Sequence, residues 1–193
     1  MRTTSPRRRV AAVLVVLVAL VVATPACAVG DEGPLVSPGC SLRDDLYSLV
    51  LTAETVRSAS RVPCLLQLQP GWELELYDAR NDRARIVLGS DRGGDRAVTV
   101  DLVRRCDLRR STEVPSEELG SDRYEEVVRL PPRYEGTRSY VFPGGCVRFR
   151  FDLDARFASG LVNEVSLMID FVERDAIRQA LTRKTRNAVE HEL

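Results

Sequence analysis

The amino-acid sequence predicts an α+β domain whose mainly antiparallel sheet of about six to seven strands lies between an N-terminal and a C-terminal helix. Three observations support this prediction. The spacing of apolar residues is helical in 42–58, changes to a period of two after Cys64, and becomes helical again in 173–190. Several of the alternating runs are joined by short segments rich in turn residues, which is typical of antiparallel strands. Strands grouped together between terminal helices are typical of α+β domains.

The chain begins with a segment that has the layout of a secretory signal. Four of its first nine residues are arginines, an unbroken apolar run follows from Val10 to Ala23, and no acidic residue occurs before Asp31. A positive flank before an apolar run of this kind directs export across a membrane. We therefore expect 1–28 to be a signal peptide or membrane anchor, 29–40 to be a linker, and 41–193 to be a single extracytoplasmic domain.

Three fates of the export segment remain open. A type I signal peptidase could cut after Ala28, where small residues form its cleavage pattern. A lipoprotein peptidase could instead cut before Cys27 and leave it lipidated, since 24–27 resembles a bacterial lipobox, from which it departs at Thr24 and Pro25. The twenty residues 10–29 are also long enough to span a bilayer as a retained anchor.

The cysteine count predicts two disulfides. Cys27 belongs to the export segment, and the four other cysteines form an even set in an exported domain: Cys40, Cys64, Cys106 and Cys146. Cys106 closes one strand-like run and Cys146 opens another, so we favour the pair Cys106–Cys146. The remaining pair, Cys40–Cys64, flanks the first predicted helix. There is no CxxC motif and His191 is the only histidine, so we expect no metal and no cofactor.

The first predicted helix covers 42–58. Ser41 with Asp44 resembles a capping box at its start, apolar residues follow at helical spacing, and Pro63 ends any continuation.

Three predicted strands follow and form a meander. They are the alternating run 72–77, the run 83–89 and the run 97–104, and short polar connections join them. The polar segment 107–122, which contains Pro115 and Gly120, is expected to be a loop.

A second group of strands completes the sheet. A less regular run covers 123–130, and the runs 137–142 and 146–153 form a hairpin around Pro143-Gly144-Gly145. Residues 163–171 also alternate between apolar and polar side chains, which predicts another strand with one buried face. The final helix is expected over 173–190.

Charge and motifs exclude several functional classes. The chain has 28 basic and 28 acidic residues, and removing the four arginines of the export segment leaves the exported part with a net charge of −4. A nucleic-acid-binding domain usually has a basic excess, so we expect no nucleic-acid partner. The sequence has no nucleophile elbow, no phosphate-binding loop of the Walker type and no H-E-x-x-H motif. We therefore assign no catalytic residue.

One strand carries charged residues that could serve acid–base chemistry. Asp152 and Asp154 lie on the polar face of the run 146–153, beside Arg148 and Arg150. Residues two apart on a strand are separated by roughly 6.5–7 Å at Cα, a spacing that could hold paired carboxylates. The same pattern is more typical of a solvated face with cross-strand ion pairs.

Four short segments resemble exported or membrane-tethered domains of unassigned function in actinobacteria: Pro63-Cys64-Leu65, Gly71-Trp72, Cys106-Asp107 and 140–147 (YVFPGGCV). The resemblance covers about 65–175 and consists of framework residues. It implies an extracytoplasmic location and disulfides, and it implies no activity.

These observations favour a non-catalytic, membrane-tethered module of the cell envelope that interacts with a partner or senses a ligand. Its expected partners are the membrane, through the N-terminus, and an envelope protein or an apolar ligand. Two alternatives remain: a carrier that holds an apolar envelope molecule between the sheet and a helix, and an envelope hydrolase that uses the carboxylates of Asp152 and Asp154.

Overall fold

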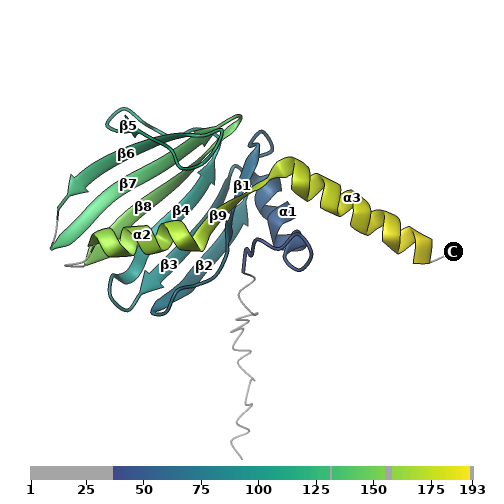
Figure 1. Cartoon of the computed structure of the whole chain (residues 1–193), viewed down its shortest axis with the longest axis horizontal. Coiled ribbons are helices and arrows are strands. Elements are labelled where there is room, and N and C mark those ends of the chain that lie inside the picture. Colours follow the sequence, from purple (N-terminus) through teal and green to yellow (C-terminus); the bar gives the residue numbers. More distant parts are fainter. Residues whose placement is uncertain (1–36, 131, 155–157, 192–193) are drawn as a thin grey trace, which may run out of the picture. The chain divides into compact units, whose positions relative to one another are not determined.

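The computed structural model describes residues 37–130, 132–154 and 158–191 (Figure 1). The export segment, with Ala28 and Cys27, lies outside these residues. The elements in chain order are α1 (Leu46–Thr55), β1 (Arg61–Leu65), β2 (Trp72–Arg80), β3 (Arg83–Ser90), β4 (Gly94–Val103), β5 (Thr112–Val114), β6 (Asp122–Arg129), β7 (Arg133–Phe142), β8 (Gly145–Asp154), α2 (Ala158–Met168), β9 (Ile169–Glu173) and α3 (Arg174–His191). Among the described residues, no helix is both long enough and apolar enough to cross a bilayer.

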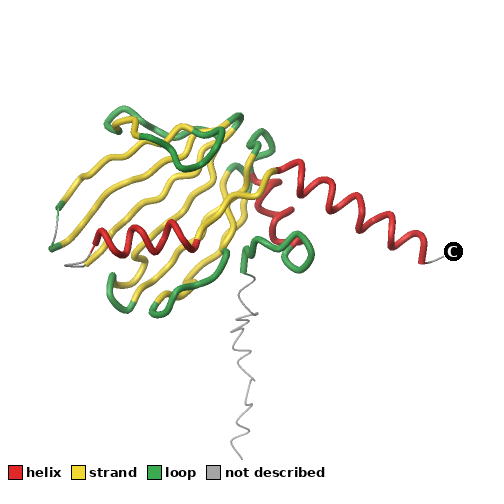
Figure 2. The backbone as a smooth tube through the Cα atoms, viewed as in Figure 1, coloured by secondary structure: helices red, strands yellow, loops and turns green. Residues whose placement is uncertain are grey.

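The fold is α+β, and its main sheet has seven antiparallel strands in the order β2-β3-β4-β8-β7-β6-β5 (Figures 1 and 2). Two meanders, β2-β3-β4 and β5-β6-β7-β8, meet where β4 pairs with β8 in the middle of the sheet. The segment 104–111 therefore carries the chain from the central strand β4 to β5 at the far edge. This long connection becomes part of the candidate site described below.

The inner face of the main sheet carries the larger hydrophobic core. Val98, Val100 and Leu102 of β4 face the same side as Phe149 and Phe151 of β8, as the alternation of these strands requires. Helix α2 lies across this face (Figure 1) and buries four residues against it: Ala158, Leu161, Val165 and Met168.

A two-stranded antiparallel ribbon, β1–β9, separates this core from a second one. Leu65 and Ile169, which are paired in the ribbon, belong to the larger core. Val62 and Cys64 point the other way, into a smaller core shared with α1 and α3 that also contains Leu49 and four further buried residues, Leu46, Ala53, Ile177 and Ala180. The ribbon thus contributes one face to each core.

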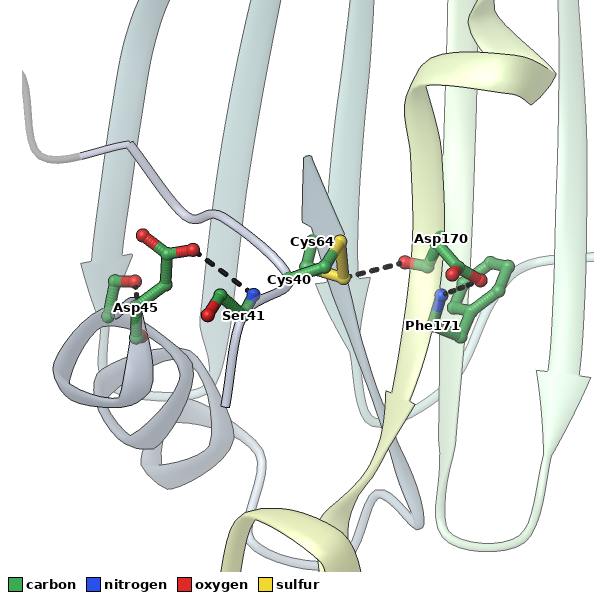
Figure 3. Close-up of a disulfide and its surroundings, with 7 residues drawn as sticks. Cys40, Ser41, Asp45, Cys64, Asp170 and Phe171 are labelled. Carbon is green, nitrogen blue, oxygen red and sulfur yellow. Dashed lines mark hydrogen bonds between the residues drawn. A yellow bond between two sulfur atoms is a disulfide. The ribbon is translucent and has the colours of Figure 1, made fainter. Parts of the chain in front are cut away.

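Both disulfides are present: Cys106–Cys146, which the sequence favours, and Cys40–Cys64, the pair that then remains. Cys40–Cys64 ties the segment before α1 to β1, with 5.1 Å between the Cα atoms (Figure 3). The Sγ atom of Cys64 lies 3.5 Å from the carbonyl oxygen of Asp170 on β9, so the disulfide sits against the ribbon. Cys106–Cys146 ties the segment after β4 to the start of β8. Two disulfides are compatible with an oxidising, extracytoplasmic setting.

The strand predicted over 163–171 is wrong for most of its length. Residues 163–168 belong to α2, and only Ile169, Asp170 and Phe171 are in the strand β9. The apolar residues fit both periods, because Leu161, Val165 and Met168 recur at the i, i+4 and i+7 spacing of a helix. Packing on the sheet selects the helix: Val165 is buried, whereas Leu167, which a strand would place beside it, is 66% exposed.

The first helix is shorter than predicted. Ser41 and Asp44 form the expected local contacts, since the Asp44 N–H donates to the Ser41 hydroxyl, but they shape a turn and the α-helix begins only at Leu46. The sequence prediction also missed β1, which contains Pro63, and the short edge strand β5 within 107–122. The β7–β8 hairpin forms as predicted, although β7 starts earlier, at Arg133.

The glycine-rich turn of this hairpin has a structural role. Gly144 has a φ of 75°, and a Cβ atom at this position would lie 1.8 Å from the carbonyl oxygen of Ser58. The Ser58 hydroxyl donates to the Gly144 carbonyl, and the Ser60 N–H donates to that of Pro143. The turn therefore docks on the segment between α1 and β1, which leaves no room for a side chain.

Candidate functional site

The outer face of the main sheet, opposite α2, carries two neighbouring rows of side chains that cross the strands. Strand register defines both rows, because directly paired residues point to the same face. The first row, from β3 to β6, is Arg85, Asp101, Arg148, Ser139 and Tyr124. The second row, over the same strands, is Val87, Thr99, Arg150, Thr137 and Glu126.

Asp101 is the buried anion of the first row, with a residue exposure of 3%. The Arg85 guanidinium donates to both of its carboxylate oxygens, at 2.7 and 3.1 Å, and a nitrogen of Arg150 lies 2.8 Å from Oδ2. The hydrogen bond from Arg85 to Asp101 raises the pKa of Arg85, because the carboxylate stabilises the protonated guanidinium. Asp101 thus pairs with both guanidinium groups, and Asp78, opposite Arg85 on β2, adds a second carboxylate beside Arg85.

Arg148 lies directly opposite Asp101 in the register but does not form an ion pair with it. It is half-buried and donates one hydrogen bond, 2.9 Å long, to the carbonyl oxygen of Asp107. Among the described residues, no carboxylate oxygen lies within 4.0 Å of its guanidinium nitrogens. The carboxylate of Asp107 is near enough for its charge to interact with that of Arg148, although the two groups form no ion pair. Arg148 therefore has N–H groups that no carboxylate of the described residues accepts.

Ser139, on the other side of Arg148 in the row, is also incompletely paired. Its residue exposure is 1%, and its hydroxyl has no hydrogen-bond partner within the described part of the chain. Buried hydroxyl groups normally have a partner, so such an exception calls for an explanation. The two adjacent positions thus leave polar groups unsatisfied on the same face of the sheet.

The segment 104–111 lies over one end of this face and completes a pocket. The disulfide Cys106–Cys146 and the hydrogen bond from Arg148 to Asp107 hold it on β8, and a 3.2 Å ion pair joins Arg110 to Glu126 on β6. The resulting pocket, which we call the arginine pocket, has a volume of about 490 Å³. It is lined by Asp107, Arg109, Arg110, Glu126, Thr137, Arg148 and Arg150.

Hydrogen bonds from the Arg109 side chain and backbone hold the pKa of Asp107 well below its usual range. Asp107 is therefore ionised at neutral pH. The arginine pocket contains four guanidinium groups and two carboxyl groups, Asp107 and Glu126. Three of the guanidinium groups are already ion-paired: Arg109 with Asp107, Arg110 with Glu126, and Arg150 with Asp101 beside the pocket. Arg148 is the fourth.

A second pocket, of about 440 Å³, adjoins the arginine pocket on the outer face. Thr137 and Arg150 line both of them, so the two form one continuous surface across β4, β8, β7 and β6. The second pocket is lined in addition by Asp95, Arg96, Thr99, Val128, Glu135, Gly136, Phe151 and Asp152.

The structure places Asp152 and Asp154 on the outer face, as the alternation predicts. Asp152 accepts two hydrogen bonds from Arg133, at 2.8 and 2.7 Å, and the backbone N–H of Asp154 donates to the carbonyl of Gly93. Both aspartates are exposed. This geometry matches the interpretation as cross-strand ion pairing on a solvated face. Among the described residues, no group of histidine, cysteine and acidic side chains could hold a metal ion.

The space between α2 and the sheet, where an apolar molecule was expected in the carrier hypothesis, is occupied by side chains. Leu153 of β8 and Met168 of α2 are 0% exposed, and Leu161 is 2% exposed. The single tryptophan, Trp72, belongs to this core, and its indole N–H donates to Glu164. The pockets described above are lined by strands and loops rather than by α2.

Sequence reasoning located part of this site. The alternation of β8 placed Arg148 and Arg150 on a polar face, but Asp107, Arg109 and Arg110 were expected only to lie in a loop. The favoured disulfide Cys106–Cys146 was the signal that could have found them, because it brings the segment after β4 onto the start of β8.

Comparisons of the chain with protein-family models, with curated proteins and with solved structures found no match.

Proposed function

We propose that this chain is a non-catalytic module of the cell envelope, tethered to the membrane through its N-terminal segment, that binds its partner through the outer face of the main sheet. The observation that carries the proposal is the continuous surface formed by the two adjoining pockets. Binding sites are typically concave, and this surface is concave and lined mainly by charged side chains.

Two further features support the proposed location in the cell envelope. The arginine-flanked apolar run of 1–28 is typical of a segment that carries a domain across a membrane and can hold it there. The two disulfides make the domain suited to an oxidising compartment. The intact mass of the mature protein from a membrane extract tests the tether, since it distinguishes cleavage after Ala28, lipidation of Cys27 and retention of the whole segment.

Site-specific photo-crosslinking in cells tests the binding surface. A photoreactive amino acid replaces Thr137, which lines both pockets, and in a matched variant it replaces Thr182, an exposed threonine of α3. We expect a discrete adduct from position 137 and none of the same mass from position 182. Equal adduct patterns from both positions, or no adduct from position 137 in correctly exported protein, would rule out the outer face as the binding surface.

A further inference from the structure

We propose that the arginine pocket binds the phosphomonoester group of its ligand. This inference rests on the proposed function, because it names the chemistry recognised by the same outer face. The pocket's volume of about 490 Å³ lies in the range of small-molecule sites, so it can hold such a group together with part of the molecule that carries it.

The pocket has an excess of positive charge, which favours an anionic ligand. Its lining together with Asp101, which pairs with Arg150, has a net charge of +1, and a phosphomonoester has a charge of about −1.5 to −2 at neutral pH. A neutral ligand would leave the positive charge unbalanced. A phosphomonoester also has three acceptor oxygens, one more than a carboxylate has, for the donors of the pocket.

The donors of the pocket also suit phosphate oxygens. Arg148 uses one of its N–H groups on the Asp107 carbonyl, and the planar guanidinium has further N–H groups that can bind two oxygens of one anion. Arg109 and Arg110 extend from the segment 104–111 with side-chain exposures of 87% and 81%. Arg109 is paired with Asp107 and Arg110 with Glu126, so a ligand oxygen would be a further acceptor for each guanidinium group.

Arg148 is the central residue of the site. A bound phosphate would supply the counter-ion that Asp101 does not provide, because the oxygens of Asp101 are held by Arg85 and Arg150. Thr137, in the next row, lines the pocket with a hydroxyl group that can donate to a phosphate oxygen. Both residues lie on strands, which hold their side chains at a fixed separation.

Calorimetric titration of the full exported chain, with both disulfides formed, tests this inference. The probe is inorganic phosphate, compared with sodium chloride at the same ionic strength. We expect saturable binding of phosphate and no binding of chloride. Arg148→Gln should weaken that binding about tenfold, the usual effect of losing charge-assisted hydrogen bonds. Arg178→Gln removes the same charge from the exposed face of α3 and should leave the affinity unchanged.

Thr137→Val gives an independent variant, because valine keeps the shape and the strand preference of threonine while it removes the hydroxyl group. We expect it to weaken phosphate binding about fivefold, as for the loss of one hydrogen bond. If Arg148→Gln alters the circular dichroism spectrum, the phosphate affinity of Thr137→Val tests the inference instead. An unchanged phosphate affinity in a folded variant, or binding of chloride and phosphate alike, would overturn the inference.

Two further titrations identify the source of the phosphate group. One uses phosphatidylcholine vesicles with and without phosphatidic acid, and the other uses soluble glycerol phosphate. Arg148-dependent binding in the first would assign a lipid headgroup, and binding in the second alone would assign a soluble ligand. Phosphate binding that is insensitive to Arg148, together with a discrete adduct from position 137, would overturn this inference and leave the proposed function intact. Arg148-dependent phosphate binding without the adduct would keep the anion site and overturn the proposal that this face binds an envelope partner.

Discussion

Glu164 of α2 is the residue whose ionisation is most clearly coupled to the packing of the helix on the sheet. It accepts hydrogen bonds from the guanidinium of Arg92, at 2.7 and 2.9 Å, and from the indole of Trp72, at 2.6 Å. The hydrogen bonds from Arg92, and then that from Trp72, lower the pKa of Glu164 from its ordinary value of 4.5. A carboxyl group with a lowered folded-state pKa stabilises the fold above its ordinary pKa, and the stabilisation is lost as pH falls through the folded-state value.

The substitution Glu164→Gln should therefore destabilise the protein at neutral pH by about 1 kcal/mol, the net value of such hydrogen bonds in a partly exposed group. The difference in unfolding free energy from the unchanged protein should shrink as the pH falls from 4.5 toward the lower folded-state pKa, because the carboxyl group is protonated first in the unfolded chain and then in the folded one. Urea unfolding of both proteins over a pH series measures this difference in unfolding free energy. Glu54→Gln, at an exposed ion pair of α1, is the control. A difference that is constant with pH would contradict this assignment.

At the scale of single elements, α2 is the segment whose secondary structure depends most on its packing partner. A strand over 163–171 would place Leu167 on the same face as the buried Val165. The helix instead places Leu167 toward solvent and buries Leu161.

Leucine-to-alanine substitutions at two positions distinguish the helix from the strand. Leu161→Ala should destabilise the domain by about 3 kcal/mol, because it removes a buried side chain and leaves a cavity in the larger core. Leu167→Ala should change stability by less than about 0.5 kcal/mol, as expected for an exposed position. Guanidinium denaturation measures both. A larger loss at Leu167 than at Leu161 would favour the strand and contradict α2.

At the scale of the whole molecule, the β1–β9 ribbon couples two cores. Leu65 and Ile169 pack in the larger core and Val62 and Cys64 in the smaller one, so neither core can lose its structure without uncovering the ribbon. We therefore expect the domain to unfold in one cooperative transition.

Leu49→Ala, in the smaller core, tests this coupling. It should lower the unfolding free energy by about 3 kcal/mol. Trp72 lies in the larger core, so its fluorescence reports there, while far-ultraviolet circular dichroism reports on all helices. Both signals should shift to the same lower denaturant midpoint. A fluorescence transition that stays at the midpoint of the unchanged protein would show that the two cores unfold independently.

Local patterns were sufficient for the fold class. The alternation in β2, β4 and β8 has the period of two that is typical of strands, and these strands and β3 were predicted close to their observed bounds. The cysteine parity and the turn at Pro143-Gly144-Gly145 are also local signals, and they led to the observed disulfides and hairpin.

Tertiary packing decided what local patterns left ambiguous. Residues 163–168 satisfy both a helical and a strand period, and the inner face of the sheet selected the helix. β1 contains a proline and β5 has only three residues, so each is a strand only because a partner strand lies beside it.

Tertiary packing also decided the composition of the candidate site. The alternation of β8 was enough to place Arg148 and Arg150 on a polar face. Their meeting with Arg109 and Arg110 depends on a chain crossing from β4 to β5 and on a disulfide between residues forty positions apart. Local periodicity carries no information about such non-local contacts, because it reports only which way each side chain points along its own strand. The sequence by itself therefore predicted an export segment and determined the faces of most strands, and the tertiary structure decided which charges share a pocket.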